Sequence, residues 1–153
     1  RFNHLGTIYT PGFLQNGSEW RAWFRSRSTE FAPGDDVGKL HVSIENGDVS
    51  AQFNTQKSAF QKPLRLHIAW LGFGLETEVQ RGENEGKILK HDFVSYHTQV
   101  VRGRVEGNTN QWQFKLDTPV DLPTNKLVKQ RALVFWVTDL NNPMPIQPTG
   151  GWF

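Results

Sequence analysis

Residues 39–53, KLHVSIENGDVSAQF, decide the fold class of this chain. Apolar and polar residues alternate on both sides of Asn46-Gly47, which is the period of a β-strand with one buried face. An Asn-Gly pair accepts the positive φ angles at both centres of a type I′ turn, so it predicts a hairpin here. The resulting register directs His41 outward and the following apolar residues into the core: Leu40, Val42, Ile44, Val49, Ala51 and Phe53.

Four segments further along the chain carry similar strand signals, each bounded by Gly, Pro, Asn or Asp. They are PLRLHIAWLGFGLETEVQRG (63–82), ILKHDFVSYHTQVVRGRVE (88–106), NQWQFKLDTP (110–119) and ALVFWVTD (132–139). About seven strands over roughly 115 residues are typical of an antiparallel two-sheet sandwich of the immunoglobulin or fibronectin type. We therefore predict a mostly β fold, with a β-sandwich domain over residues 39–153.

Composition limits the classes of function. The chain of 153 residues suits one main core, and its 37% apolar residues, with six Trp and eleven Phe, are enough for a packed interior. The net charge of +2 comes from scattered Lys and Arg, so we expect no nucleic-acid partner. No apolar run approaches the ~18 residues of a membrane span. The absence of cysteine excludes a disulfide framework, a Cys-ligated zinc site and a thiol nucleophile.

The N-terminal stretch predicts a different module. Residues 6–20, GTIYTPGFLQNGSEW, indicate a strand, a turn and a second strand. Residues 31–38, which contain Pro33-Gly34, are the natural linker to the β-rich part.

Three segments, YTPGFLQNGSEW (9–20), RGENEGKILKHDFV (81–94) and PIQPTGGWF (145–153), resemble the 1223 family of bacterial domains of unknown function. These are exported proteins with a thioredoxin-like half followed by a β-rich half. The resemblance implies that residues 1–30 are the C-terminal remnant of a thioredoxin-like domain, with Pro11 at the cis-proline position. It also implies a periplasmic or secreted location. Such proteins usually carry a Cys-x-x-Cys pair that this chain lacks, so we interpret the chain as the C-terminal part of a longer protein.

Candidate binding residues gather in and after the polar segment RGENEGK (81–87). It can be a plain hairpin loop, or a recognition loop held by rigid strands. His91 and Asp92 follow it, and His91 would share a strand face with His97 if that strand is unbroken. No HxH, HExxH or comparable ligand spacing is present, so we expect no metal and no cofactor. The candidate binding residues are Arg81, Glu83, Asn84, Lys87, His91 and Asp92.

The six tryptophans have two competing uses, burial and ligand stacking. Trp70 and Trp136 sit inside apolar strands and are expected in the core, and Trp112 should share a face with Phe114. We expect the terminal GGWF to be ordered, with Trp152 and Phe153 buried. The alternative is that Trp152 is presented for binding. The candidates for an exposed sugar platform are Trp20, Trp23 and Trp152.

No motif indicates catalysis. There is no Gly-x-Ser-x-Gly elbow, and Asp35-Asp36 lie in the linker rather than on opposed strands. The sequence predicts an accessory, non-catalytic β-sandwich region of an exported thioredoxin-like protein, which stabilises that protein or recognises its partner. The alternatives are a carbohydrate or small-ligand binding module, and a fragment of a thiol-disulfide oxidoreductase without its cysteines. Its partner would be the thioredoxin-like half, another protein, or a second copy bound through residues 1–24.

Overall fold

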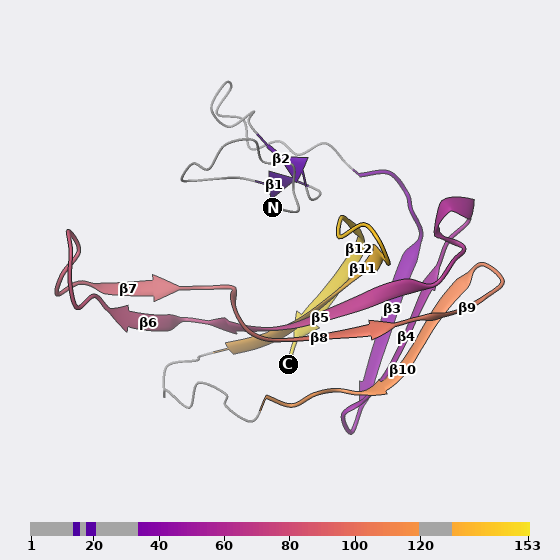
Figure 1. The fold of residues 1–153 in the computed structure, drawn as a ribbon. Coiled ribbons are helices and arrows are strands. Elements are labelled where there is room, and N and C mark those ends of the chain that lie inside the picture. The colour runs from indigo at the N-terminus through magenta and orange to yellow at the C-terminus, as the bar shows by residue number, and fades with distance from the viewer. Residues whose placement is uncertain (1–13, 16–17, 21–33, 120–129) are drawn as a thin grey trace.

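The computed structural model describes residues 14–15, 18–20, 34–119 and 130–153 (Figure 1). All its extended elements are β-strands, joined at one place by a short 3₁₀ turn. In chain order they are β1 (Leu14–Gln15), β2 (Ser18–Glu19), β3 (Lys39–Glu45), β4 (Asp48–Asn54), η1 (Ser58–Phe60), β5 (Leu64–Phe73), β6 (Leu75–Glu78), β7 (Ile88–His91), β8 (Val94–Arg102), β9 (Arg104–Glu106), β10 (Thr109–Lys115), β11 (Gln130–Asp139) and β12 (Pro145–Trp152).

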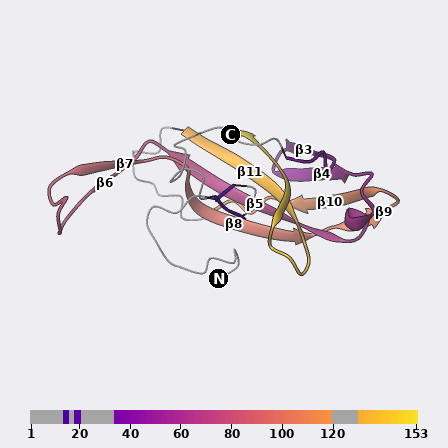
Figure 2. The ribbon, with the colours of Figure 1, turned by 90° about the horizontal axis from the view of Figure 1, so that it is seen from above.

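Two four-stranded antiparallel sheets form the body. The first sheet has the order β3-β4-β10-β9 and the second has the order β12-β11-β5-β8. Figures 1 and 2 show the two sheets facing each other, and the core cluster draws side chains from both. The predicted mostly β, antiparallel fold is confirmed.

The hairpin of β3 and β4 forms as the sequence predicts. Asn46 and Gly47 have φ angles of 51° and 81°, and Glu45 pairs with Asp48 across the turn. Leu40, Val49, Ala51 and Phe53 are buried, while Val42 and Ile44 are partly buried against the same core. His41 is exposed. Alternation and turn chemistry therefore fix the register of the first sheet.

The core lies between the sheets and contains two tryptophans. Trp70 on β5 is 4% exposed and Trp112 on β10 is 2% exposed. Each indole N–H is satisfied by a backbone carbonyl, that of Asp117 at 3.1 Å and that of Val101 at 3.2 Å respectively. The prediction for Trp70 is confirmed, and Phe114 packs on the same core as Trp112. The prediction for Trp136 is wrong: it is half-buried on the outer face of β11, because its neighbours Phe135 and Val137 take the inner positions.

Strands β5 and β8 continue beyond the body as a separate two-stranded arm, residues 75–91, made of β6 and β7 (Figures 1 and 2). The continuation is interrupted at Gly74, with φ 66°, and at Phe93, with φ 59°. The strand between His91 and His97 is therefore broken. The shared face that their even spacing suggested does not form.

The chain passes from the second sheet to the first at Gly103, between β8 and β9. The N–H of Gly103 donates to the carbonyl of Leu64 at 2.8 Å, which ties this corner to the start of β5.

The C-terminal segment is ordered, as expected, but its aromatic residues are not buried. β12 pairs with β11 at the edge of the second sheet, where Pro145 and Pro148 are tolerated because an edge strand needs fewer donors. Trp152 lies opposite Ala132 and is 68% exposed, and Phe153 is 64% exposed. The predicted burial of these two residues is wrong: Trp152 points outward together with Ala132, and Phe153 follows the last residue of β12 and is mostly exposed.

Three of the sequence-based predictions concern the N-terminal part. β1 and β2 pair antiparallel, with Gln15 opposite Ser18, on either side of Asn16-Gly17. Pro11 lies outside the described residues, as do most of residues 1–30, so the thioredoxin-like module and self-association through residues 1–24 stay predictions. Within the described ranges, no helix is long and apolar enough to cross a membrane.

Candidate functional site

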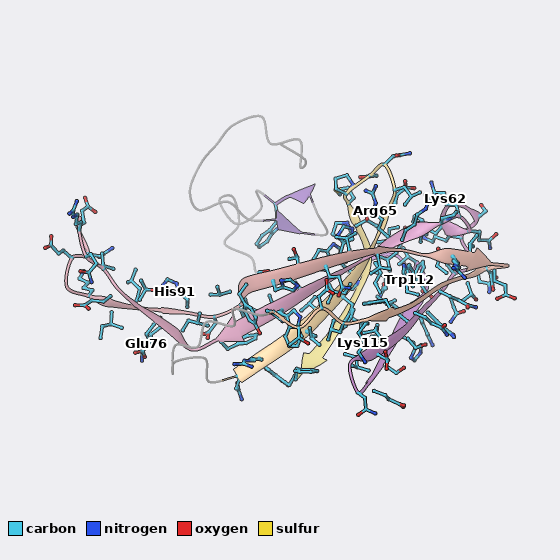
Figure 3. All side chains as sticks on the ribbon, turned by 60° about the horizontal axis from the view of Figure 1, so that its bottom comes forward. Lys62, Arg65, Glu76, His91, Trp112 and Lys115 are labelled. Carbon is cyan, nitrogen blue, oxygen red and sulfur yellow. The ribbon has the colours of Figure 1, made fainter. Side chains whose placement is uncertain are left out.

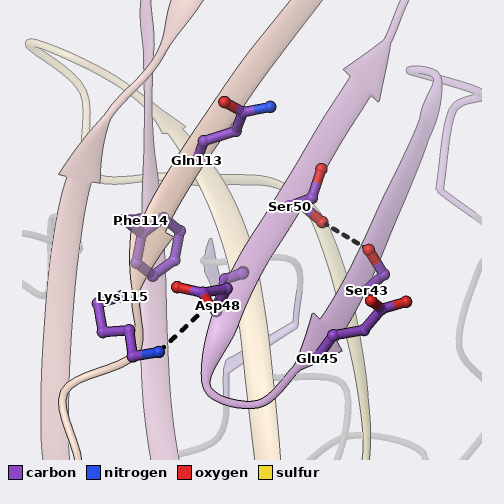
Figure 4. A pocket seen from close by; sticks show the side chains of 8 residues that line it. Ser43, Glu45, Asp48, Ser50, Gln113, Phe114 and Lys115 are labelled. Atoms are coloured by element: carbon purple, nitrogen blue, oxygen red, sulfur yellow. Dashed lines mark hydrogen bonds and ion pairs between the residues drawn. The ribbon is translucent and has the colours of Figure 1, made fainter.

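The outer face of the first sheet is polar and largely self-compensated. Its hollow of about 620 Å³ lies over β3, β4 and β10 (Figure 4). There the Lys115 Nζ lies 3.2 Å from the Asp48 carboxylate and donates to the Asn46 carbonyl at 2.9 Å. Ser43 donates its hydroxyl to the Ser50 carbonyl at 3.4 Å. The charge of Lys115 is thus paired with that of Asp48, and we interpret this face as an ordinary solvent-exposed surface.

The outer face of the second sheet carries more apolar side chains, which lie among the polar residues Arg65, His67, Thr98 and Arg102. Leu66, Ile68 and Leu133 point into the core, so strand alternation directs the residues next to them in sequence to the outer face. On β8, Val100 is 54% exposed. The apolar side chains on this face are Ala69, Leu71, Phe73, Val100, Ala132, Val134, Trp136 and Trp152. Two outer faces of one molecule thus differ in polarity.

Three rings gather at the end of this face nearest the arm, and we call Phe73, Phe93 and Trp152 the aromatic cluster. The Phe73 ring centroid lies 4.6 Å from that of Phe93 and 4.7 Å from that of Trp152, with interplanar angles of 66° and 60°. Phe93 is 71% exposed. Phe153 lies apart from the cluster and meets the buried Trp70 edge-on at 4.9 Å.

The position of Phe93 is held by an unusual backbone. A bulky residue at φ 59° is uncommon, because its Cβ crowds the chain in the left-handed region. Next to it, the Asp92 carboxylate accepts the N–H of Gly74 at 2.7 Å, which joins the two strands at the base of the arm. Residues in sparsely populated backbone conformations are concentrated at functional sites of proteins. Here that backbone places an exposed ring beside Phe73.

A stacked pair lies farther along the same outer face. The rings of His67 and Trp136 are 5.0 Å apart and within 12° of parallel. His67 Nε2 lies 2.8 Å from the Thr138 hydroxyl, which in turn donates to the Asp139 carbonyl. When the Thr138 hydroxyl donates its one proton to the Asp139 carbonyl, His67 Nε2 is the donor to that hydroxyl, and the opposite tautomer reverses the bond. Burial, with a smaller contribution from Arg65, lowers the pKa of His67, so the neutral ring is favoured.

The predicted binding residues divide between two places. Arg81, Glu83, Asn84 and Lys87 lie at the exposed tip of the arm, between the ends of β6 and β7. His91 pairs with Leu75 at the base of the arm (Figure 3), and Asp92 follows it. At the tip, Lys87 Nζ donates to the Asn84 side chain at 2.9 Å, and backbone bonds between residues 79 and 87 close the loop. Asp92 is engaged by Gly74. The structure therefore does not bring the six residues together as one site.

The histidines do not converge either. His41 lies on the first sheet and His67 on the second, and no group of three or more His, Asp or Glu side chains in the described residues could hold a metal ion. His97 and Tyr96 lie at a bulge in β8, opposite Trp70. His97 Nε2 and the Tyr96 hydroxyl are buried without a hydrogen-bond partner in the described part of the chain. An incoming polar group would gain a hydrogen bond there.

Sequence reasoning singled out Trp152 but not the two rings beside it. Phe73 could have been found, because it has the opposite strand parity to Trp70 and therefore leaves the core face. Phe93 gave no such signal, since its position depends on the broken strand at the arm base.

Comparison with known proteins gives a family and nothing finer. No curated protein and no solved structure matches the chain. A family model described as "Protein of unknown function (DUF1223)" matches residues 1–138. That match covers most of the 153 residues, and the chain belongs to the DUF1223 family.

Proposed function

We propose that this chain is an accessory, non-catalytic β-sandwich region that recognises a protein partner through the aromatic cluster. The observation that carries the proposal is the exposure of Phe93 and Trp152 beside Phe73, at the end of the second sheet's outer face nearest the arm. Contiguous exposed apolar surface of this kind marks interaction sites. Aromatic residues are also enriched at the centres of protein interfaces.

The finer fold in this proposal is an immunoglobulin-like sandwich. In that fold, strands named A to G form one sheet in the order A-B-E-D and another in the order G-F-C, with C′ added beyond C in some types. Taking β3, β4, β5, β8, β9, β10, β11 and β12 as A, B, C, C′, D, E, F and G reproduces both orders. Trp70 then takes the place of the buried tryptophan of strand C. Loops and faces of such sandwiches commonly serve recognition.

The ring geometry favours a protein over a carbohydrate. A sugar ring stacks on an aromatic face, and an extended platform needs rings that are close to coplanar. The planes of Phe73 and Trp152 meet at 60° and those of Phe73 and Phe93 at 66°. Such an edge-to-face cluster presents a ridged apolar surface, which suits a complementary protein surface. A carbohydrate module is the second candidate, on the single exposed face of Trp152.

The partner in this proposal is the thioredoxin-like half of the same exported bacterial protein, in the periplasm or outside the cell. The three segments that resemble the family support this assignment, and the match over residues 1–138 supports the family itself. The chain itself has no cysteine, so the thiol-disulfide chemistry of the redox alternative would belong to that other half. Another protein, or a second copy bound through residues 1–24, are the alternative partners.

The test begins with the coding sequence upstream of Arg1. If it encodes a thioredoxin-like half, the longer protein and the present chain are compared by acrylamide quenching and hydrogen exchange. We expect Trp152 and the base of the arm to be protected only in the longer protein. Trp152→Ala with Phe93→Ser should release the hydrogen-exchange protection at the base of the arm, whereas His41→Ala, on the polar face, should not. Equal exposure in both proteins, together with binding on a glycan array, would support the carbohydrate candidate instead.

A further inference from the structure

A second, polar pocket lies at the corner where β8 passes into β9, at the opposite end of β8 from the aromatic cluster. Its volume is about 370 Å³. It is lined by Val101, Arg102, Arg104, Gln111, Trp112 and Gln113. Two arginines and two glutamines are thus among the lining residues, and no Asp or Glu of the described residues lines the pocket.

The backbone that carries the two arginines is fixed on both sides. Gly103 lies between them, is buried, and donates its N–H to the Leu64 carbonyl at 2.8 Å. The Val101 carbonyl accepts the indole N–H of Trp112 at 3.2 Å. The strand segment is therefore anchored, and a ligand held by Arg102 and Arg104 would not have to order it.

The positive charge of the pocket is not matched by an ion pair within the described part of the chain. The ion pairs there are Lys57–Asp35, Lys62–Asp139 and Lys115–Asp48, and none of them uses an arginine. Arg102 also stands directly opposite Arg65 in the β5–β8 ladder. Like charges in that arrangement destabilise a sheet. A bound anion would relieve this repulsion.

The first sheet supplies an internal comparison. The lysine at the hollow of Figure 4, Lys115, is neutralised by Asp48. At the corner pocket no such ion pair is formed among the described residues: Gln111 donates its amide to Glu106 at 3.3 Å, and Glu106 does not line the pocket. Both hollows border β10. Lys115 at the first hollow has a carboxylate partner, whereas Arg102 and Arg104 at the corner pocket have none among the described residues.

We propose that the corner pocket binds a polyatomic oxyanion, namely a carboxylate, sulfate or phosphate group of a small ligand. Arg102 and Arg104 supply forked donors that match two oxygens of such a group, and Gln113 supplies an amide donor. This site is independent of the aromatic cluster and does not rest on the proposed function.

The experiment is a titration of the whole chain followed by ¹H–¹⁵N NMR, with sodium phosphate, sodium sulfate and sodium galacturonate in separate arms. Sodium chloride at equal ionic strength is the reference, because nonspecific screening affects all exposed charges. We expect saturable shifts of the Gly103 and Arg104 amides and of the Trp112 indole N–H. The arm that saturates at the lowest concentration identifies the oxyanion.

Variants separate a built site from diffuse attraction. Arg102→Gln and Arg104→Gln should each weaken binding about tenfold or more, since each removes charged hydrogen bonds. Arg104→Lys keeps the charge but loses the fork, so it should bind more weakly than the native chain. Lys115→Gln is the matched control on β10 and should leave the affinity unchanged. Shifts that equal those in chloride, or that persist in the Arg102→Gln/Arg104→Gln double variant, would overturn the proposal.

Discussion

The indole ring of Trp112 occupies the space directly in front of Gly103. A Cβ atom built on Gly103 would lie 2.8 Å from Cε2 and 2.9 Å from Nε1 of that ring. The ring cannot easily retreat, because Trp112 is 2% exposed and its N–H is bonded to the Val101 carbonyl. This contact explains why the corner between the two sheets has a glycine.

We therefore expect Gly103→Ala to destabilise the fold by about 1–3 kcal/mol, the usual cost of overpacking a core. The measurement is urea unfolding followed by tryptophan fluorescence. Gly151→Ala is the control, since a Cβ there would meet nothing within 4 Å. Equal unfolding midpoints for the native chain and Gly103→Ala would show that the indole can move aside.

The turn of the first hairpin gives a second prediction. Gly47 has φ 81°, and the atom nearest to a Cβ at this position would be 3.5 Å away, so the constraint is backbone conformation rather than space. Gly47→Val should destabilise by about 1 kcal/mol or more, because a β-branched residue resists positive φ. Gly47→Asn should cost much less, since Asn tolerates the left-handed region. Equal stability of the Val and Asn variants, measured by thermal unfolding, would contradict this account.

The parts of the fold that sequence could predict are those set by local patterns. The β3–β4 register follows from period-two alternation around Asn46-Gly47, and both are read within a single short stretch of sequence. The arm and the corner depend on contacts between distant residues: Asp92 with Gly74, and Trp112 with Gly103. No local pattern encodes those contacts.

The candidate site shows the same division. From sequence, Trp152 is a candidate for exposure, but the expectation is a buried C-terminus, because large aromatic residues favour burial. The pairing of β12 with β11 determines the outcome, since it sets Trp152 opposite the outward-facing Ala132. A continuous apolar run such as VFWVT likewise does not say which of its aromatics faces the core. In the structure, Phe135 faces the core and Trp136 lies on the outer face of β11.

The His67 site predicts a pH dependence of stability. Because burial lowers the folded-state pKa of His67 below its ordinary value of 6.5, the unfolded chain binds a proton more readily than the folded chain. The contribution of neutral His67 to the free energy of unfolding is therefore fully present above pH 6.5, and it is lost as the pH falls toward the folded-state pKa. Unfolding free energies measured from about pH 8 to about pH 5 should fall on the acid side.

His67→Gln should flatten this pH profile, because glutamine does not titrate. His41→Gln, at an exposed position on the first sheet, should leave the slope as it is in the native chain. If the His67→Gln profile keeps the native slope, another group is responsible for it.

The arm should be dispensable for folding. Its strands pair only with each other among the described elements, and Gly74 and Asp92 close its base without help from the tip. Replacing residues 75–91 by Asn-Gly should change the unfolding free energy by about 1 kcal/mol or less, since a shorter connection costs little entropy. Differential scanning calorimetry measures this. A much larger loss would mean that the arm contributes to the body's core.

The two tryptophans of the second sheet should respond to truncation in opposite ways. Trp70 is 4% exposed and bonded to Asp117, so Trp70→Ala should cost about 3–5 kcal/mol. Trp152 is 68% exposed and gains mainly an edge-to-face contact with Phe73. Trp152→Ala should therefore cost only about 0.5–1.5 kcal/mol, the range for such a pair.

Acrylamide quenching provides the independent measurement for Trp152. Trp152→Phe should reduce the readily quenched fraction of the fluorescence, whereas Trp70→Phe should not, because only the first removes an exposed indole. A large stability loss in Trp152→Ala, with no change in quenching for Trp152→Phe, would show that this ring is covered in solution. The aromatic cluster would then be part of the core, and the partner-recognition proposal would lose the exposed surface on which it depends.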